Sequence, residues 1–266
     1  MKTKIKILFF SLLFISTIYA QEEGQKSAED LAKQLANPVA SLISVPLQNN
    51  FDFNVGPWEG FKYTLNIQPV VPLSIGEDWN LISRTIIPII SQSDVNANGK
   101  DASGLGDIVQ SAFFSPKKPT KNGLIWGFGP IFLIPTASDD YLGADKWAIG
   151  PNAVFLKVNG PWTYGGLINH MWSFAGNGPN DINASFFQPF LTFATPQGAS
   201  YTIASENTQS WDNDIFGGFV GAYYAKVVKF GNQLTQLGGG PKVFYGNNPF
   251  NPDWGIRVNI VLLYPK

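Results

Sequence analysis

The segment from Phe61 to Ile75 alternates between apolar and polar residues over most of its length. Its odd positions are apolar, and its even positions include Lys62 and Asn66, with Val70 and Pro72 as the exceptions. Because successive side chains of a strand point to opposite faces, this pattern predicts a strand with one apolar and one polar face. Its length suits a tilted strand that crosses a bilayer, which needs about 9–11 residues.

The same kind of pattern recurs along the rest of the chain and predicts twelve strands. They are Ser41–Phe53, Phe61–Ile75, Trp79–Ser91, Leu105–Ser115, Leu124–Pro135, Lys146–Val158, Trp162–Phe174, Ile182–Thr195, Ser200–Glu206, Ile215–Val228, Gln233–Tyr245 and Asp253–Tyr264. Alternate connections are compact, and most of the others are longer and polar, as expected for the two ends of a membrane barrel. The sequence therefore predicts an all-β protein, a transmembrane antiparallel β-barrel of about twelve strands with both termini in the periplasm.

Prolines inside the predicted strands conflict with this pattern. Pro69, Pro72, Pro88, Pro130 and Pro189 each lack the N–H that a strand donates to its neighbour. The alternation itself offers no reason for them.

The N-terminal residues predict a secretory signal. Lysines at the start, a twelve-residue apolar stretch and a small residue at position 20 are typical of a cleaved signal peptide over residues 1–20. Residues 21–40 then form a periplasmic segment, in which Ser27 and Asp30 resemble a capping box for a short helix ending near Ala36. This segment is either loosely packed in the periplasm or inserted into the lumen. Residues 41–266 form the barrel domain.

Composition narrows the class of protein. Charged residues make up 14% of the chain and aromatic residues another 14%, and no run outside the signal approaches the roughly 18 apolar residues of a spanning helix. The net charge is −1, and cleavage of the three signal lysines lowers it to about −4, which argues against nucleic-acid binding. The chain has no cysteine, so disulfides and thiolate metal sites are excluded. An outer-membrane barrel or a large soluble β-protein remains.

If the apolar faces contact lipid, the opposite faces line the lumen. By this parity the candidate pore-lining residues are Gln48, Asn50, Asp52, Lys62, Asn66, Gln68, Arg84, Gln110, Gln188, Lys242, Arg257 and Asn259. The two arginines are expected inside because arginine at the bilayer midplane costs about 2–4 kcal/mol. Such a lumen passes or binds small polar solutes; alternatively, the arginines pair with carboxylates and fill the interior.

Catalytic and cofactor signatures are weak. His170, the single histidine, shares a face with Trp162 and Trp172, whereas Ser173 lies on the opposite face. A hydrolase would need these groups side by side. The sequence has no phosphate loop, dinucleotide fingerprint or zinc-ligand spacing, so no cofactor or metal is expected. Asp107 ends a turn, or else it lines an external vestibule or binds a cation; the turn-ending role is favoured.

Several blocks resemble a known family. They are Asn37–Asn50, Trp79–Pro88, Ser103–Asp107, Phe132–Thr136, Gln188–Phe190 and the C-terminal Trp254, Arg257, Pro265 and Lys266. Together they resemble the bacterial outer-membrane β-barrel family often labelled neuromedin U or transporter, which is related to an outer-membrane channel family linked to phenol degradation. The resemblance covers most of the chain after the signal. It implies a barrel and a role in transport.

The sequence thus predicts a non-enzymatic channel or transporter in the bacterial outer membrane that passes small solutes through a polar lumen. The expected partners are outer-membrane lipid, a small solute and the barrel assembly machinery. A closed structural or adhesion barrel is the main alternative, and an outer-membrane hydrolase is a weaker one.

Overall fold

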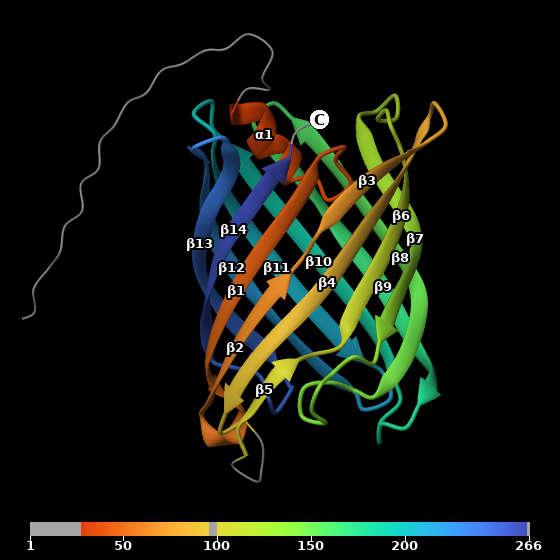
Figure 1. Ribbon diagram of the computed structural model, residues 1–266, viewed down its shortest axis with the longest axis vertical. Helices are drawn as coiled ribbons and strands as arrows, with labels where there is room; N and C mark the ends of the chain where they lie inside the picture. The colour runs from red at the N-terminus through yellow and green to blue at the C-terminus, as the bar shows by residue number, and fades with distance from the viewer. Residues whose placement is uncertain (1–27, 96–99, 265–266) are drawn as a thin grey trace, which may run out of the picture.

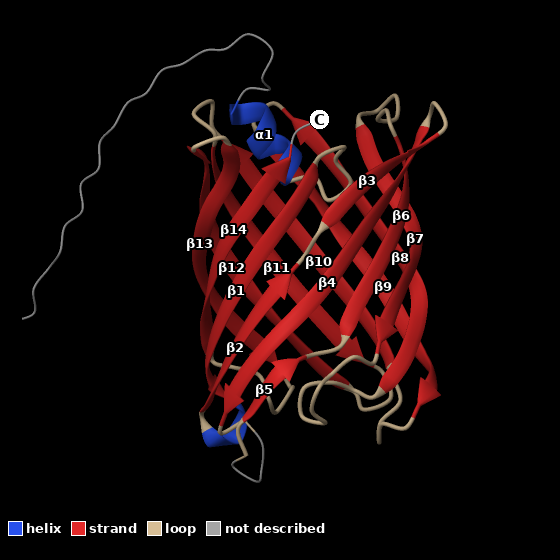
Figure 2. Ribbon diagram, viewed as in Figure 1, coloured by secondary structure: helices blue, strands red, loops and turns tan. Residues whose placement is uncertain are grey.

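The computed structural model describes residues 28–95 and 100–264, which form a closed antiparallel β-barrel with one short α-helix at one mouth (Figures 1 and 2). In chain order the elements are α1 (Ala28–Leu35), β1 (Ile43–Val55), a 3-10 turn (Gly56–Trp58), β2 (Gly60–Ile67), β3 (Val70–Ile75), β4 (Trp79–Ser93), β5 (Ala102–Leu105), β6 (Ile108–Pro116), β7 (Leu124–Ile134), β8 (Lys146–Asn159), β9 (Trp162–Gly176), β10 (Asn183–Ala194), β11 (Ala199–Ser210), β12 (Ile215–Phe230), β13 (Gln233–Gly246) and β14 (Trp254–Tyr264). The predicted signal peptide and Ser27 lie outside the described residues.

The barrel has the predicted twelve strands. They comprise fourteen segments, since two of the strands are each divided into two. β2 and β3 share the partners β1 and β4, and β5 and β6 both pair with β4. Neighbours in sequence pair all round, and β14 closes the sheet onto β1, with Ile43 opposite Tyr264 and Phe53 opposite Trp254. Closure leaves no open sheet edge, which a bilayer does not tolerate. The predicted fold class is confirmed.

Two predicted strands are interrupted, and one predicted strand ends too early. The Phe61–Ile75 strand is interrupted at Gln68 and Pro69, although its alternation continues across the gap. A second interruption, at Gly106 and Asp107, separates β5 from β6. β11 continues to Ser210 instead of ending at Glu206, because its last residues still pair with β10 and β12. The segment after Glu206 is polar on both faces, so alternation gave no sign of this extension.

Interruptions in the pairing account for most of the strand prolines. Pro130 lies opposite β6 residues with which β7 forms no paired positions, and Pro189 occupies the corresponding gap between β10 and β11. Pro69 falls in the gap between β2 and β3, and Pro88 faces the gap between β5 and β6. On its other side, each of Pro88, Pro130 and Pro189 keeps a regular neighbour. Each of these prolines, which lack a backbone N–H, therefore lies where the strand has no paired residue on one side.

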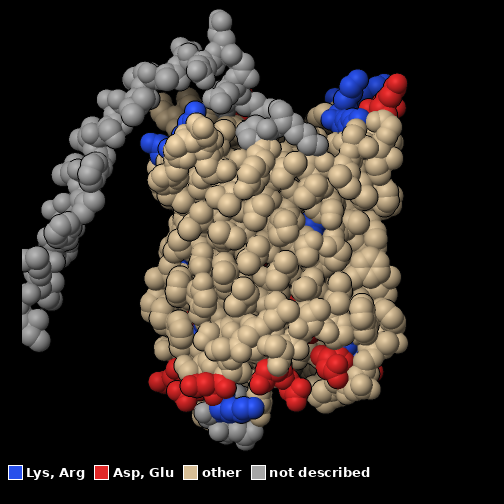
Figure 3. Space-filling view, in the orientation of Figure 1, with Lys and Arg blue, Asp and Glu red and all other residues tan. Residues whose placement is uncertain are grey.

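The outer surface has the polarity of a membrane protein. On the face seen in Figure 3, the barrel wall is a broad belt with almost no visible charge, and charged side chains gather at its two ends. Exposed aromatic residues such as Trp162, Trp172, Trp254 and Tyr264 belong to the outward faces of their strands. Amphipathic rings favour the boundary between bilayer and water. Of the residues that the structure describes, no helix is long and apolar enough to span a membrane.

α1 lies at the mouth where the chain's described ends meet (Figure 1). Leu31 and Ala32 are 3% and 1% exposed and belong to an apolar cluster with Val227, Val261 and Leu263, from the lumen faces of β12 and β14. Burial of a leucine side chain contributes roughly 1.5–3 kcal/mol, so this contact holds the helix inside the mouth. Of the two predicted placements of this segment, the structure has the inserted one.

Candidate functional site

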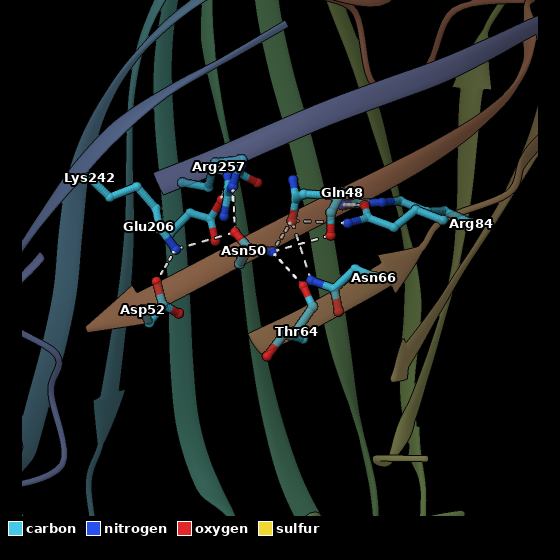
Figure 4. A network of polar contacts seen from close by, with 11 residues as sticks. Gln48, Asn50, Asp52, Thr64, Asn66, Arg84, Glu206, Lys242 and Arg257 are labelled. Carbon is cyan, nitrogen blue, oxygen red and sulfur yellow. Dashed lines mark hydrogen bonds and ion pairs between the residues drawn. The ribbon is translucent and has the colours of Figure 1, made fainter. Parts of the chain in front are cut away.

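A layer of polar side chains crosses the middle of the lumen (Figure 4). Its members lie at alternate positions of β1, β2, β4, β11, β13 and β14, on the face opposite the exposed apolar residues. Figure 4 labels Gln48, Asn50, Asp52, Thr64, Asn66, Arg84, Glu206, Lys242 and Arg257. The alternation required by lipid outside is therefore what gathers these groups inside.

Two ion pairs form one side of this layer. The Lys242 ammonium lies 2.6 Å from an Asp52 carboxylate oxygen, and the Arg257 guanidinium donates to Glu206 over 2.8 Å. Asn50 joins the pairs, because its Oδ1 accepts from Arg257 Nε at 2.8 Å and from Lys242 Nζ at 3.2 Å. Both cations are almost fully buried, at 2% and 6% residue exposure. Buried charges are tolerated only with such partners, so each pair depends on both members.

An amide cluster forms the other side. Gln48 Oε1 accepts from the side-chain amides of Asn66 and Gln68 at 3.3 Å and of Asn50 at 3.4 Å. Arg84 Nη2 donates to Gln68 Oε1 over 2.8 Å. No described carboxylate lies within 4.0 Å of the Arg84 guanidinium. Arg84 therefore keeps its charge next to neutral amides instead of an ion-pair partner.

Cavities lie on both sides of the polar layer. One of about 270 Å³ reaches from Gln48 and Arg84 across to β8, β9 and β10. Two others, of about 250 and 260 Å³, lie beneath α1 and share Gln188 with the first. A fourth, of about 310 Å³, extends towards the long-loop end and shares Glu206 and Thr208 with the first. Cavities thus follow one another along much of the bore, and neighbouring cavities share lining residues.

No protein-family model matches the sequence, and no curated protein matches it. Among solved structures, an outer membrane channel from Pseudomonas putida F1 is similar over 84% of this chain and 96% of that chain, with 13% identity and a TM-score of 0.70. This chain shares that fold. Weaker likenesses are to the outer membrane phospholipase A from Escherichia coli (13% identity, 89% and 98% covered, TM-score 0.47) and to OprB from Pseudomonas putida (9% identity, 87% and 95% covered, TM-score 0.26).

Within this barrel fold, eleven of the twelve predicted lumen residues lie on the inner face. Ten of them belong to the polar layer or the cavities just described, and Lys62 lies opposite Asp52 in the β1–β2 register. Asn259 lines the two cavities beneath α1.

Gln110 is the exception, and its prediction was wrong. It lies opposite Thr85 in the β4–β6 register, on the outer face. Its Oε1 accepts a hydrogen bond from Thr85 Oγ1 at 2.6 Å, and its Nε2 donates one to Ser83 Oγ at 3.1 Å. These two residues flank the inward-facing Arg84. Phe113 on the same strand is fully buried in the lumen. The inward position next to Gln110 is Ser111, opposite Arg84, and two hydroxyl groups satisfy the glutamine amide on the outer face.

Sequence reasoning missed Glu206 and the amides of Asn152 and Asn169. Glu206 shares its face with Ser200 and Thr202, so the same parity places it inside. It was overlooked because the predicted strand ended at that residue. Asn152 and Asn169 lie opposite each other on β8 and β9 and line the 270 Å³ cavity.

Asp107 has the role of a turn-ending residue. Its carboxylate accepts hydrogen bonds from the backbone N–H groups of Thr136 and Ala137, both at 3.1 Å, and of Ala144 at 2.6 Å. These bonds fix the loop between β7 and β8.

His170 has a serine neighbour that the sequence did not reveal. On the outer face, its Nδ1 lies 2.7 Å from Ser185 Oγ, which also accepts from Trp211 Nε1 at 2.9 Å. Its Nε2 is buried and has no hydrogen-bond partner among the described residues. A serine–histidine pair acts as a nucleophile when a third group orients the imidazole, and the described residues place none there.

Asp181 forms a separate charged contact in the loop between β9 and β10. Lys146 Nζ donates to its carboxylate over 2.8 Å, and Ser173 Oγ donates at 3.2 Å. The hydrogen bond from Lys146 is the main reason that the pKa of Asp181 is lowered from its usual value.

Proposed function

We propose that this protein is an outer-membrane channel that passes small solutes through its polar lumen. One observation carries the proposal. The cavities above, within and below the polar layer share lining residues, and Gln188 borders three of them. A structural barrel packs its bore with side chains, whereas this bore keeps a series of adjoining cavities bordered by amides and charges.

The uncharged outer belt supports placement of the barrel in a bilayer, with α1 on the periplasmic side. The compact connections lie at the same end as α1, as periplasmic turns do in bacterial barrels (Figure 1). Exposed lysines at positions 117, 118 and 121 mark this end, and Asp140, Asp181, Asp212 and Asp214 lie in the loops at the other. Cleavage of residues 1–20 and insertion by the barrel assembly machinery complete this proposed route to the outer membrane.

The fold agrees with this function. The Pseudomonas putida structure with the same fold is described as an outer membrane channel. The sequence blocks that resemble the family labelled neuromedin U or transporter imply the same class of activity. We assign transport, without catalysis, to this chain on the basis of its lumen.

In this proposal α1 controls the periplasmic exit. Leu35 and Pro38 border the cavities on the α1 side, so a solute that passes the polar layer meets the N-terminal segment before it leaves. The helix is held by an apolar cluster of modest size, and movement of one short element opens the bore without altering the strands.

Single-channel recording in planar bilayers tests the channel directly. Gln188→Trp places a large ring at the residue shared by three cavities, and we expect conductance to fall severalfold. Gln110→Trp, on the outer face, is the matched control and should conduct as the unmodified protein does. Heat-modifiable migration on a gel verifies that both variants fold.

A closed structural or adhesion barrel predicts a different result. The unmodified protein and a variant lacking residues 28–36 would then both show no conductance at any voltage. That outcome refutes the channel.

A further inference from the structure

The polar layer carries more positive than negative charge. Lys242 is paired with Asp52 and Arg257 with Glu206, so each pair is close to neutral. Arg84 has no described carboxylate within 4.0 Å. It therefore adds a positive charge that has no directly bonded carboxylate, although Glu206 attracts it across the same cavity. The low-dielectric surroundings strengthen the attraction of this charge for an anion.

Arg84 borders the 270 Å³ cavity next to neutral hydrogen-bonding groups. Gln48, Asn66 and Gln68 line the same end of this space. One guanidinium N–H group donates to Gln68, and a guanidinium has five N–H donors in a fixed fork. The remaining donors match the two oxygens of a carboxylate, which arginine binds in a bidentate manner.

Two asparagines line the cavity from β8 and β9. Asn152 and Asn169 are 3% and 8% exposed. Neither the amide nitrogen nor the oxygen of Asn152 has a hydrogen-bond partner among the described residues, and the Asn169 oxygen also has none. Buried amide groups without partners are costly, so these atoms are suited to bind a ligand that enters the cavity.

Much of the remaining wall of the cavity is apolar and consists of Ile86, Val109, Ile131, Leu167, Met171 and Phe186. Ser111, Gln188, Glu206 and Thr208 also border the cavity, and the Glu206 carboxylate is already paired with Arg257. A mostly apolar space with a few polar groups at fixed places is the usual form of a small-molecule site. A fully hydrated inorganic ion gains nothing from these side chains, whereas a solute with an apolar body does.

We propose that this cavity is a binding site for small organic carboxylates with an apolar body. The carboxylate binds to Arg84, the body lies against the wall from Ile86 to Phe186, and the asparagine amides bind polar substituents on the solute. The inference rests on the proposed channel and names its solute class.

Binding and conductance are measured separately on the full chain. In isothermal titration calorimetry of the detergent-solubilised protein, we expect hexanoate to bind and hexanamide to bind roughly tenfold or more weakly, as loss of a charge-assisted hydrogen bond predicts. Hexylammonium should not bind. Arg84→Gln should weaken hexanoate by a similar factor, and Lys226→Gln removes an exposed cation outside the lumen and should leave the affinity unchanged.

In planar bilayers, hexanoate should lower the single-channel current of the unmodified protein and of Lys226→Gln, and should do so much less in Arg84→Gln. Equal affinity for hexanoate and hexanamide, or full hexanoate binding by a folded Arg84→Gln protein, overturns the carboxylate site and leaves the channel standing. Hexanoate binding that depends on Arg84 without conductance in any variant supports the site and refutes the channel.

Discussion

Replacement of Arg257 by methionine tests whether the polar layer stabilises the barrel. The substitution keeps a long side chain in the lumen but removes the guanidinium that lies 2.8 Å from Glu206 and 2.8 Å from Asn50 Oδ1. It also removes a cation–π contact with Phe219, whose ring centre is 5.1 Å away. The Glu206 carboxylate then remains partly buried in the lumen, and among the described residues the Gln188 amide, at 3.3 Å, is its remaining direct partner.

The magnitude follows from the burial of the pair. Removal of one member of a buried ion pair costs about 3–5 kcal/mol, because the other charge is left without compensation. The side chain of Arg257 is 7% exposed and that of Glu206 is 23% exposed, so water at Glu206 reduces the loss. We therefore expect the free energy of unfolding to fall by about 3 kcal/mol. Glu206→Gln combined with Arg257→Met removes both charges and should recover a large part of this loss.

Reversible urea unfolding in detergent micelles, followed by tryptophan fluorescence, measures both values. Lys226→Met is the control, since it removes a cation from the outer surface and should change stability little. A loss below about 1 kcal/mol for Arg257→Met would show that the pair is not a buried one. A double variant as unstable as the sum of the two single variants would show that the charges do not interact.

Three further results are expected. Deletion of residues 28–36 should raise single-channel conductance severalfold, because it removes α1 from the mouth; unchanged conductance would show that this helix does not limit flow. Gln110→Leu should leave ion selectivity unchanged in reversal-potential measurements, since its side chain faces outward. Carboxyl NMR titration should show the pKa of Asp181 below its usual value, and Lys146→Met should raise it towards that value, with the Ser173 hydrogen bond still lowering it. Because this pKa is depressed on folding, the contact with Lys146 stabilises the loop above the pKa of an unfolded aspartate and is lost as pH falls through the folded value.

Alternation predicted the strands because lipid imposes one chemistry on the outer face of every strand. β14 shows this clearly. Trp254, Ile256 and Val258 are about two-fifths exposed, whereas Gly255 and Arg257 between them are buried. The rule needs only neighbouring residues, so it can be read along the sequence without knowledge of any contact.

The same rule failed at Gln110 because the sequence around it, from Ile108 to Phe113, does not alternate. Polarity alone assigned the glutamine to the lumen, although Ser83 and Thr85 satisfy it outside. The ion pair between Glu206 and Arg257 also could not be predicted from the sequence. Its members lie on strands that are not adjacent and meet only when the barrel closes.

The polarity of the lumen face also changes along the barrel axis. This change explains why two inward-facing residues of β14 are apolar, although strict alternation predicts polar residues there. Val261 and Leu263 lie on the same face as Arg257, yet they are apolar. They pack in the cluster that contains Leu31 and Ala32 of α1. The inner face of β14 is therefore polar at Arg257 and Asn259, where it borders open space, and apolar where it receives the helix. Apolar residues on the lumen side of a strand end thus indicate an inserted segment. This signal can be found in the amino-acid sequence alone, and it favours insertion of the N-terminal segment into the lumen over loose packing in the periplasm.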